Sequence, residues 1–159
     1  MRIGVISDTH GTLPAEALER LRGVDHILHA GDVGEGVLEE LAELGIPMSV
    51  VRGNTDPESA GLPLEIRRKL EGVSILMRHI QPPPERLAPH QVEQFAHDGV
   101  RVVVFGHTHR PLAEERGGVL FINPGSAGQP RHGLPPSVGI LTVQDGRAEF
   151  ELLPYGANE

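Results

Sequence analysis

The sequence predicts an α/β fold built around a largely parallel sheet. The first half of the chain alternates short β-like runs with amphipathic helical patterns, which is typical of βαβ units. The run Val102–Phe105 is continuously apolar, as expected of a strand buried on both faces. Because no internal repeat, low-complexity tract or linker interrupts the pattern, residues 1–159 are expected to form a single domain.

The first part of the chain is predicted to contain three strands and two helices. The expected elements are strands at Arg2–Ser7, His26–His29 and Ser49–Arg52, a helix from about Pro14, and a helix over Gly36–Leu44. Thr12 is a candidate cap for the first helix. In the second helix Val37, Leu41 and Leu44 recur at i, i+4 and i+7, and Gly45 is expected to end it.

The rest of the chain is predicted to be mostly strand. Leu64–Met77 reads as two strands joined by a Glu71-Gly72 turn, and a helix carrying Val92 and Phe95 follows the proline-broken stretch Gln81–Pro89. Beyond Val102–Phe105 the expected strands are Val119–Asn123, Val138–Val143 and Ala148–Leu153, the last two joined by an Asp145-Gly146 turn. These three are predicted to form a C-terminal β-meander.

Composition excludes several classes of protein. The net charge of −8 argues against bulk nucleic-acid binding, because such proteins carry basic patches. The absence of cysteine excludes disulfides, thiolate metal sites and cysteine nucleophiles. No run is long enough for a membrane span, and Ser7-Asp8 ends the first apolar run too early for a secretory signal. A cytoplasmic protein is expected.

Polar motifs follow five of the predicted strands. In an open α/β sheet, ligands bind at the carboxyl ends of the strands, so these motifs are expected to converge. They are Asp8-Thr9-His10, Gly31-Asp32, Gly53-Asn54, His79 and Gly106-His107-Thr108-His109.

These side chains suit a borderline divalent metal bound through nitrogen and oxygen, such as Mn, Fe, Co, Ni or Zn. Together they offer more ligands than one ion needs, whereas two ions that share a bridging carboxylate would use them all. Each motif alone has a structural explanation as well. Asp-x-His can be a cap or a turn, Gly-Asp and Gly-Asn are common turn dipeptides, and a lone His79 can be a buried structural histidine.

The ordered set of motifs resembles the calcineurin-like metallophosphoesterases, in particular their small bacterial and archaeal phosphodiesterase branch. The resemblance extends from Ile3-Gly4-Val5-Ile6-Ser7-Asp8-Thr9-His10 to Asn123-Pro124-Gly125-Ser126. It implies a four-layer αββα sandwich, in which two mixed sheets are flanked by helices and the metals lie at the carboxyl ends of the strands. It also tilts the expected assembly towards a homo-oligomer.

The resemblance implies a role for each motif. Asp8, His10 and His109 correspond to ligands of a first metal, and Asn54, His79 and His107 to ligands of a second, with Asp32 bridging. The catalytic residues implied are Asp32 and Asn54. Asn54, Asn123 and Ser126 are the implied substrate contacts, although the Asn123-Pro124-Gly125-Ser126 loop reads equally well as a turn that leaves an edge strand.

The sequence departs from the family pattern at two positions. The family usually places Gly after the ligand that corresponds to His79, whereas this chain has Ile80 and then the Pro82–Pro84 run, and Ile adopts a left-handed turn only at a cost. Larger relatives have a histidine after the Gly-Asn pair, whereas this chain has Thr55. The small branch also lacks that histidine.

The resemblance implies hydrolysis of phosphodiester bonds by a hydroxide bridging two divalent ions, with Mn as the first candidate. A phosphomonoesterase or nucleotidase with the same site and, less favoured, a non-catalytic binding scaffold of the same fold remain as alternatives. The other histidines are expected to be uninvolved. His29 is expected to pack internally, His90 and His97 to face solvent, and His132 to lie near the substrate side.

Overall fold

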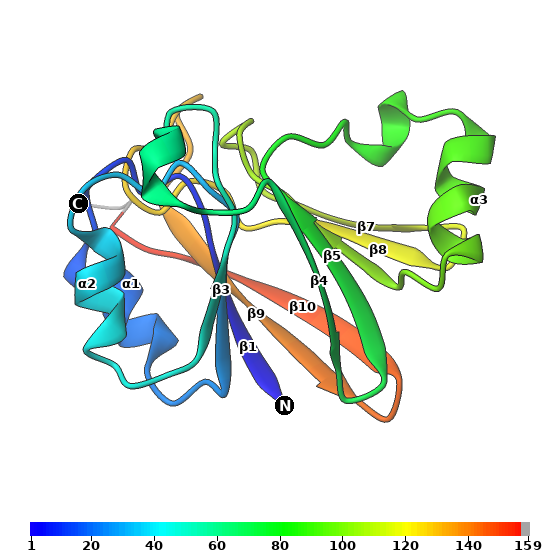
Figure 1. The fold of residues 1–159 in the computed structure, drawn as a ribbon, viewed down its shortest axis with the longest axis horizontal. Helices are drawn as coiled ribbons and strands as arrows, with labels where there is room; N and C mark the ends of the chain where they lie inside the picture. Colours follow the sequence, from blue (N-terminus) through cyan, green and yellow to red (C-terminus); the bar gives the residue numbers. More distant parts are fainter. Residues whose placement is uncertain (157–159) are drawn as a thin grey trace.

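The computed structural model of the protein describes residues 1–156, and the predicted domain's last residues, 157–159, lie outside the described residues. The elements follow one another as shown in Figure 1. They are β1 (Arg2–Ile6), α1 (Ala15–Leu21), β2 (His26–His29), α2 (Val37–Ala42), β3 (Met48–Val50), η1 (Glu58–Ala60), β4 (Glu65–Leu70), β5 (Val73–Arg78), η2 (Pro84–Arg86), α3 (Pro89–His97), β6 (Val102–Val104), β7 (Leu112–Arg116), β8 (Val119–Asn123), β9 (Ser137–Gln144) and β10 (Arg147–Pro154).

The strands form two mixed five-stranded sheets. Their orders are β10-β9-β1-β2-β3 and β4-β5-β6-β8-β7. Helices α1 and α2 cover the outer face of the first sheet, and α3 covers the outer face of the second (Figure 1). The expected four-layer αββα sandwich is therefore confirmed.

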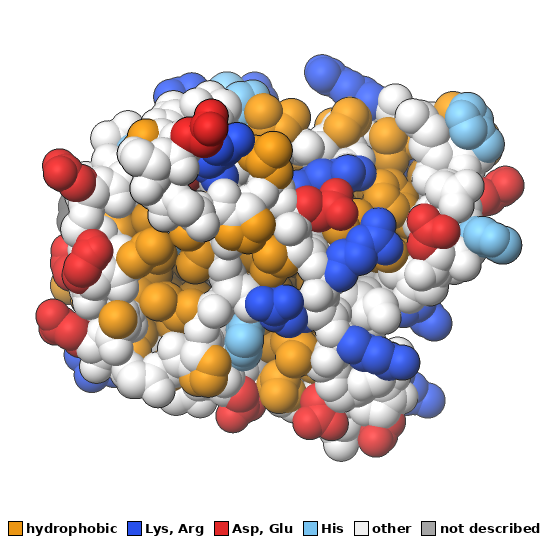
Figure 2. All heavy atoms as spheres, in the orientation of Figure 1, with side chains coloured by type: hydrophobic (Ala, Val, Ile, Leu, Met, Phe, Trp, Pro, Cys, Tyr) orange, Lys and Arg blue, Asp and Glu red, His pale blue; other side chains and the backbone are white. Residues whose placement is uncertain are grey.

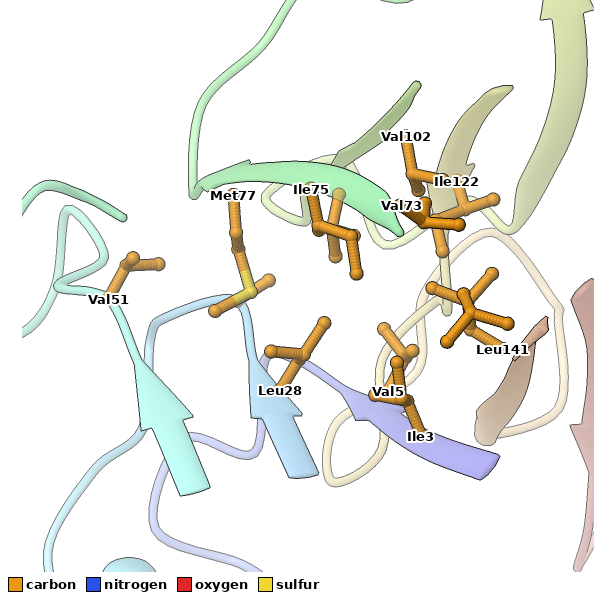
Figure 3. Packing of buried hydrophobic residues seen from close by; sticks show 13 residues of the cluster. Ile3, Val5, Leu28, Val51, Val73, Ile75, Met77, Val102, Ile122 and Leu141 are labelled. Carbon is orange, nitrogen blue, oxygen red and sulfur yellow. The ribbon is translucent and has the colours of Figure 1, made fainter. Parts of the chain in front are cut away.

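The main core lies between the two sheets. Along β1, Ile3 and Val5 point into this core, whereas Ile6 packs under the helices. Figure 3 shows Leu28 of the first sheet across from Met77 and Ile75 of the second. Because strand side chains alternate between faces, and helices or a sheet cover both faces here, the central strands are apolar on both sides.

Parallel pairing brings the functional loops to one rim. Strands β1, β2 and β3 run parallel in the first sheet, and β5, β6 and β8 run parallel in the second. Their carboxyl ends point the same way, so the loops after them gather at the top of the molecule in Figure 1. This is the rim that the polar motifs were expected to share.

Both predicted hairpin turns are confirmed. Glu71 and Asp145 have φ of 48° and 51°, and the glycines that follow them have φ of 79° and 77°. Two consecutive left-handed residues are the signature of the tight turn that matches the twist of antiparallel strands. The turns join β4 to β5 and β9 to β10.

The predicted C-terminal β-meander is wrong. Strand β8 pairs with β6 and β7 in the second sheet, whereas β9 and β10 join β1 in the first. The physical reason is that the segment 124–136 crosses from the second sheet to the first. Strand β8 therefore pairs with β6, and β9 pairs with β1. Strand β7 was missed, because Leu-Ala-Glu-Glu-Arg lacks a strand pattern, although the Gly117-Gly118 turn after it is a hairpin signal.

The predicted cap at Thr12 is also wrong. Helix α1 begins at Ala15 after Pro14, and no side chain caps it. The Thr12 amide instead donates to the Thr9 carbonyl at 2.9 Å, so Thr12 closes a turn inside the loop after β1. None of the helices in residues 1–156 is long and apolar enough to cross a membrane.

Candidate metal centre

Two clusters of Asp and His side chains lie at the rim. The ligand atoms of Asp8, His10 and His109 lie within 4.8 Å of one another, and so do those of Asp32, His79 and His107. We call these the first and the second half-site.

The two half-sites adjoin. Nε2 of His10 in the first lies 3.6 Å from Oδ2 of Asp32 in the second. In the other direction, Nε2 of His79 lies 3.9 Å from Oδ1 of Asp8. The clusters fit a dinuclear metal site, in which two ions sit a few ångströms apart and share ligands.

Three buried atoms in the half-sites lack a hydrogen-bond partner. They are Oδ1 of Asp8, Nε2 of His10 and Nε2 of His79. A buried polar atom without a partner is costly, so such atoms call for an explanation. Bound divalent ions would supply the missing interactions, and carboxylate oxygen with imidazole nitrogen is the donor set that such ions accept. The residues present therefore fit a metal centre.

Backbone carbonyls fix the orientation of two of these imidazoles. Nδ1 of His79 donates to the Ala30 carbonyl at 2.7 Å, and Nδ1 of His109 donates to the Gln129 carbonyl at 3.0 Å. With the proton on Nδ1, the lone pair of Nε2 faces the neighbouring carboxylates. Such carbonyl contacts are typical of metal-binding histidines, because they fix the tautomer and the ring plane.

Backbone strain is concentrated at the same residues. Asp8, His10, Asp32, His107 and His109 all have φ between 46° and 69°, in the left-handed region. Residues with a Cβ rarely adopt this region, and when they do, they cluster at functional sites. These left-handed residues let alternate positions of a loop turn their side chains towards the two half-sites.

Two glycines let the loops approach one another. A Cβ at Gly53 would lie 2.1 Å from Oδ1 of Asp32, and a Cβ at Gly106 would lie 2.1 Å from Oγ of Ser7. Any side chain at either position would therefore collide with the centre. The Gly-Asn and Gly-His pairs are required by close packing of loop against loop.

The half-sites favour positive charge. Burial alone would raise the pKa of Asp32, but the His79 imidazole, 3.2 Å away, and the Thr55 amide hold it well below its ordinary value. Burial likewise lowers the pKa of His79, yet the Asp32 and Asp8 carboxylates and the Ala30 carbonyl together raise it. Both shifts show carboxylates that stabilise a cation in this space.

The departure at Ile80 does not displace His79. Ile80 is not among the residues with positive φ, so the chain leaves β5 without a left-handed turn. Its side chain is 55% exposed and His79 stays buried in the second half-site. Asn54 reaches the same half-site, because its Oδ1 lies 3.0 Å from Nδ1 of His107.

Two expected substrate contacts are buried beneath the site. Asn123 is fully buried, donates to the Gly106 carbonyl at 3.0 Å and accepts from the Gly125 amide at 2.9 Å. The Ser126 hydroxyl donates to the Asp8 carbonyl at 2.9 Å and accepts from the Gln129 amide. Both side chains therefore help to position the loops of the site, and a contact with substrate stays a prediction for them.

Two further residues support the loops: Asp56, which the sequence did not single out, and His29, which is buried as expected. The Asp56 carboxylate accepts amide hydrogen bonds from Gly53 at 2.8 Å and Val33 at 2.9 Å, and so ties the loop after β3 to the loop after β2. The buried His29 accepts from the Gly31 amide at 3.1 Å and contacts the Thr9 hydroxyl at 3.1 Å. The spacing Gly-Asn-x-Asp was the one available signal for Asp56.

The remaining histidines lie outside the half-sites. His90 and His97 are exposed on α3, as expected. His26 contacts the Ser49 hydroxyl at 2.9 Å. His132 is exposed and lies 3.1 Å from Arg110 and 3.2 Å from the Thr108 carbonyl.

Comparison with known proteins gives a consistent result. Residues 1–146 match the calcineurin-like phosphoesterase superfamily domain. Phosphodiesterase YfcE of Escherichia coli is 32% identical over 89% of this chain and 87% of its own length. Among solved structures, an archaeal phosphodiesterase superposes with a TM-score of 0.77 at 27% identity, covering 96% of this chain and all of its own. Vps29 of Entamoeba histolytica with bound zinc gives a TM-score of 0.76 at 26% identity, covering 97% of this chain and 99% of its own.

Fold, motif order and sequence similarity agree over nearly the whole chain. The chain belongs to the calcineurin-like phosphoesterase superfamily, in its branch of small prokaryotic phosphodiesterases, and is a hydrolase of phosphoric ester bonds.

Proposed function

We propose that this protein hydrolyses phosphodiesters with two divalent ions, Mn²⁺ foremost. The observation that carries the proposal is the set of unpartnered buried atoms on Asp8, His10 and His79 inside two adjoining Asp/His clusters. When bound, two such ions supply an activated water as nucleophile and neutralise charge on the phosphoryl oxygens. No protein nucleophile is then required.

The chain's own residues hold and orient the reactants. In this proposal Asp8, His10 and His109 hold one ion, His79, His107 and Asn54 hold the other, and Asp32 bridges them. The lowered pKa of Asp32 favours its ionised form, which is the form that binds metal. The exposed Asn54 amide is also available to a phosphoryl oxygen. Thr55 donates its backbone amide to Oδ1 of Asp32 at 2.8 Å, which helps to fix the bridging carboxylate.

Two alternatives use the same fold. A phosphomonoesterase would need the same metal centre, so ligand geometry does not separate it from a diesterase. A binding scaffold would have little reason to keep the metal ligands, and the Asp/His cluster in each half-site therefore favours an enzyme. The cytoplasmic location and the homo-oligomer expected from the sequence stay predictions, as does a single domain over residues 1–159.

The test is hydrolysis of matched esters by protein stripped of metal and then reloaded. We expect bis(p-nitrophenyl) phosphate to be cleaved faster than p-nitrophenyl phosphate with Mn²⁺, and neither to be cleaved after chelation. Faster monoester cleavage would favour the phosphomonoesterase. Full activity in excess chelator, with metal content confirmed as nil, would refute the metal mechanism.

A further inference from the structure

A pocket of about 560 Å³ opens beside the second half-site. Its lining includes Asn54 and His79, which belong to the second half-site, together with Arg52, Leu64 and Ile80. This volume is in the range of small-molecule sites. A phosphoryl group held at the metal centre stays bonded to both of its ester substituents, so one substituent can extend into this pocket.

The pocket has an unusual apolar surface. Leu64 and Ile80 are 62% and 55% exposed, the highest values among the large hydrophobic side chains of residues 1–156. Hydrophobic and basic side chains lie side by side over β4 and β5 on the face shown in Figure 2. Covering two such side chains with a ring removes apolar area from water, which is favourable.

Arg52 supplies a free cation in the same pocket. Arg52 is half-buried, and its guanidinium makes no hydrogen bond or ion pair with another side chain in residues 1–156. The other lining arginine, Arg78, is engaged by Gln81 at 2.8 Å and Glu65 at 3.2 Å. An unpaired guanidinium in a cleft is suited to a phosphate, which it can bind through two parallel hydrogen bonds.

The acidic side chains of the pocket do not cancel this charge at close range. Glu65 is paired with Arg78, and the Asp56 carboxylate is bound by the Gly53 and Val33 amides. Glu58 is exposed on η1 and lies within 4.0 Å of no cationic group in the described part of the chain. Arg52 therefore remains available to a ligand.

We propose that this pocket receives one ester substituent of the substrate and that the substituent is nucleotide-like. Its ring packs on Leu64 and Ile80, and a second phosphate binds Arg52. The inference rests on the proposed phosphodiesterase function and adds the class of substrate to it.

The kinetic test compares two diesters with the same leaving group. One is the p-nitrophenyl ester of thymidine 5′-phosphate, and the other carries an additional 3′-phosphate on the same thymidine. We expect the 3′-phosphate to raise kcat/KM by roughly tenfold in the Mn²⁺-loaded native protein, the value of one charge-assisted contact. In Arg52→Gln the ratio should fall to about one. The matched control is Arg147→Gln, which removes an exposed arginine at the start of β10, outside the pocket. This variant should keep the native ratio.

The second test measures binding without catalysis. In chelator-treated protein, thymidine 3′,5′-bisphosphate should shift the NMR methyl signals of Leu64 and Ile80 saturably, and Arg52→Gln should weaken this binding roughly tenfold. A native ratio of one, a ratio kept in Arg52→Gln, or unshifted methyl signals would overturn the inference. Absence of any ester hydrolysis would instead refute the proposed function, and the binding result would still decide the pocket.

Discussion

The two half-sites differ in how the protein encloses them. In the first, Asp8 and His109 are buried and His10 is half-buried. Hydroxyl groups from two segments hold this half-site, because Oδ2 of Asp8 accepts from Ser7 at 2.7 Å and its carbonyl accepts from Ser126 at 2.9 Å. In the second, His107 and Asn54 are exposed.

This difference separates two tasks within one centre. We expect the enclosed half-site to hold an ion more tightly, whereas the more open one adjoins the pocket lined by Asn54 and His79. We therefore expect a chelator to remove the ion of the second half-site first. Substrate selection is expected on the same open side.

Asp32 should show the largest effect, because it is the proposed ligand that the half-sites share. Asp32→Asn keeps the shape of the side chain but removes its charge and the bridge. We expect a loss of more than about 10³-fold in kcat with Mn²⁺, beyond that of removing one electrostatic contact. Steady-state kinetics with metal analysis measures it. Near-native turnover would mean that the half-sites work independently.

His79 and His109 test the half-sites separately. We expect His79→Ala to lower bound metal from two ions towards one and to reduce the rate sharply, because the second half-site is already open. His109→Ala should lower the metal affinity of the first half-site. Because Asp8 is buried there, the ion of that half-site should still exchange slowly. Metal analysis after dialysis gives both stoichiometries. Two ions retained in His79→Ala would show that other groups complete the second half-site.

Asp56 should affect the second half-site more than the first. Asp56→Asn removes the charge that holds the Gly53 and Val33 amides on either side of Asp32 and Asn54. We expect metal affinity there to fall roughly 10–100-fold, as for other residues that orient ligands. Ser126→Ala is the matched control, since its hydroxyl supports Asp8. Calorimetric titration with metal should show weaker binding at the second half-site in Asp56→Asn and at the first half-site in Ser126→Ala. Equal losses at both half-sites in either variant would contradict this assignment.

His29 lies beneath both half-sites and predicts acid sensitivity. Burial lowers its pKa from 6.5 to about 4, and its Nδ1 already accepts from the Gly31 amide. The unfolded chain therefore binds more protons than the folded protein between these pH values. The stability due to neutral His29 is complete above pH 6.5 and falls as the pH drops to 4, by on the order of 3 kcal/mol.

Denaturant unfolding of metal-free protein at several pH values measures this loss. His29→Gln should show a shallower dependence on pH, because the group that titrates is absent. Equal slopes in the two proteins would assign the acid sensitivity to other groups.

Local patterns in the sequence predicted the α/β class and the convergence of the motifs, whereas the four-layer sandwich was implied by the family resemblance. Apolar runs define the central strands, and parallel pairing then brings the residues after them to one rim. Long-range choices were not predictable. Strand β8 joins the second sheet through pairing with β6, which a local pattern does not encode. The hydrogen bond from the Asn123 amide to the Gly106 carbonyl joins residues 17 positions apart, and a local pattern does not predict it either.

The smallest effects are expected on helix α3, whose histidines contrast with those of the half-sites. His90 and His97 are exposed on α3 at the outer face of the second sheet, and neither belongs to an Asp/His cluster in residues 1–156. His107, in contrast, is exposed but lies within reach of Asp32 and His79. Exposure alone therefore does not decide whether a histidine takes part in the metal centre.

We expect His90→Ala and His97→Ala to leave metal content and rate nearly unchanged, and the free energy of unfolding within about 0.5 kcal/mol of the native value. His107→Ala should lower both metal content and rate. Metal loss in either α3 variant would mean that this helix takes part in the centre.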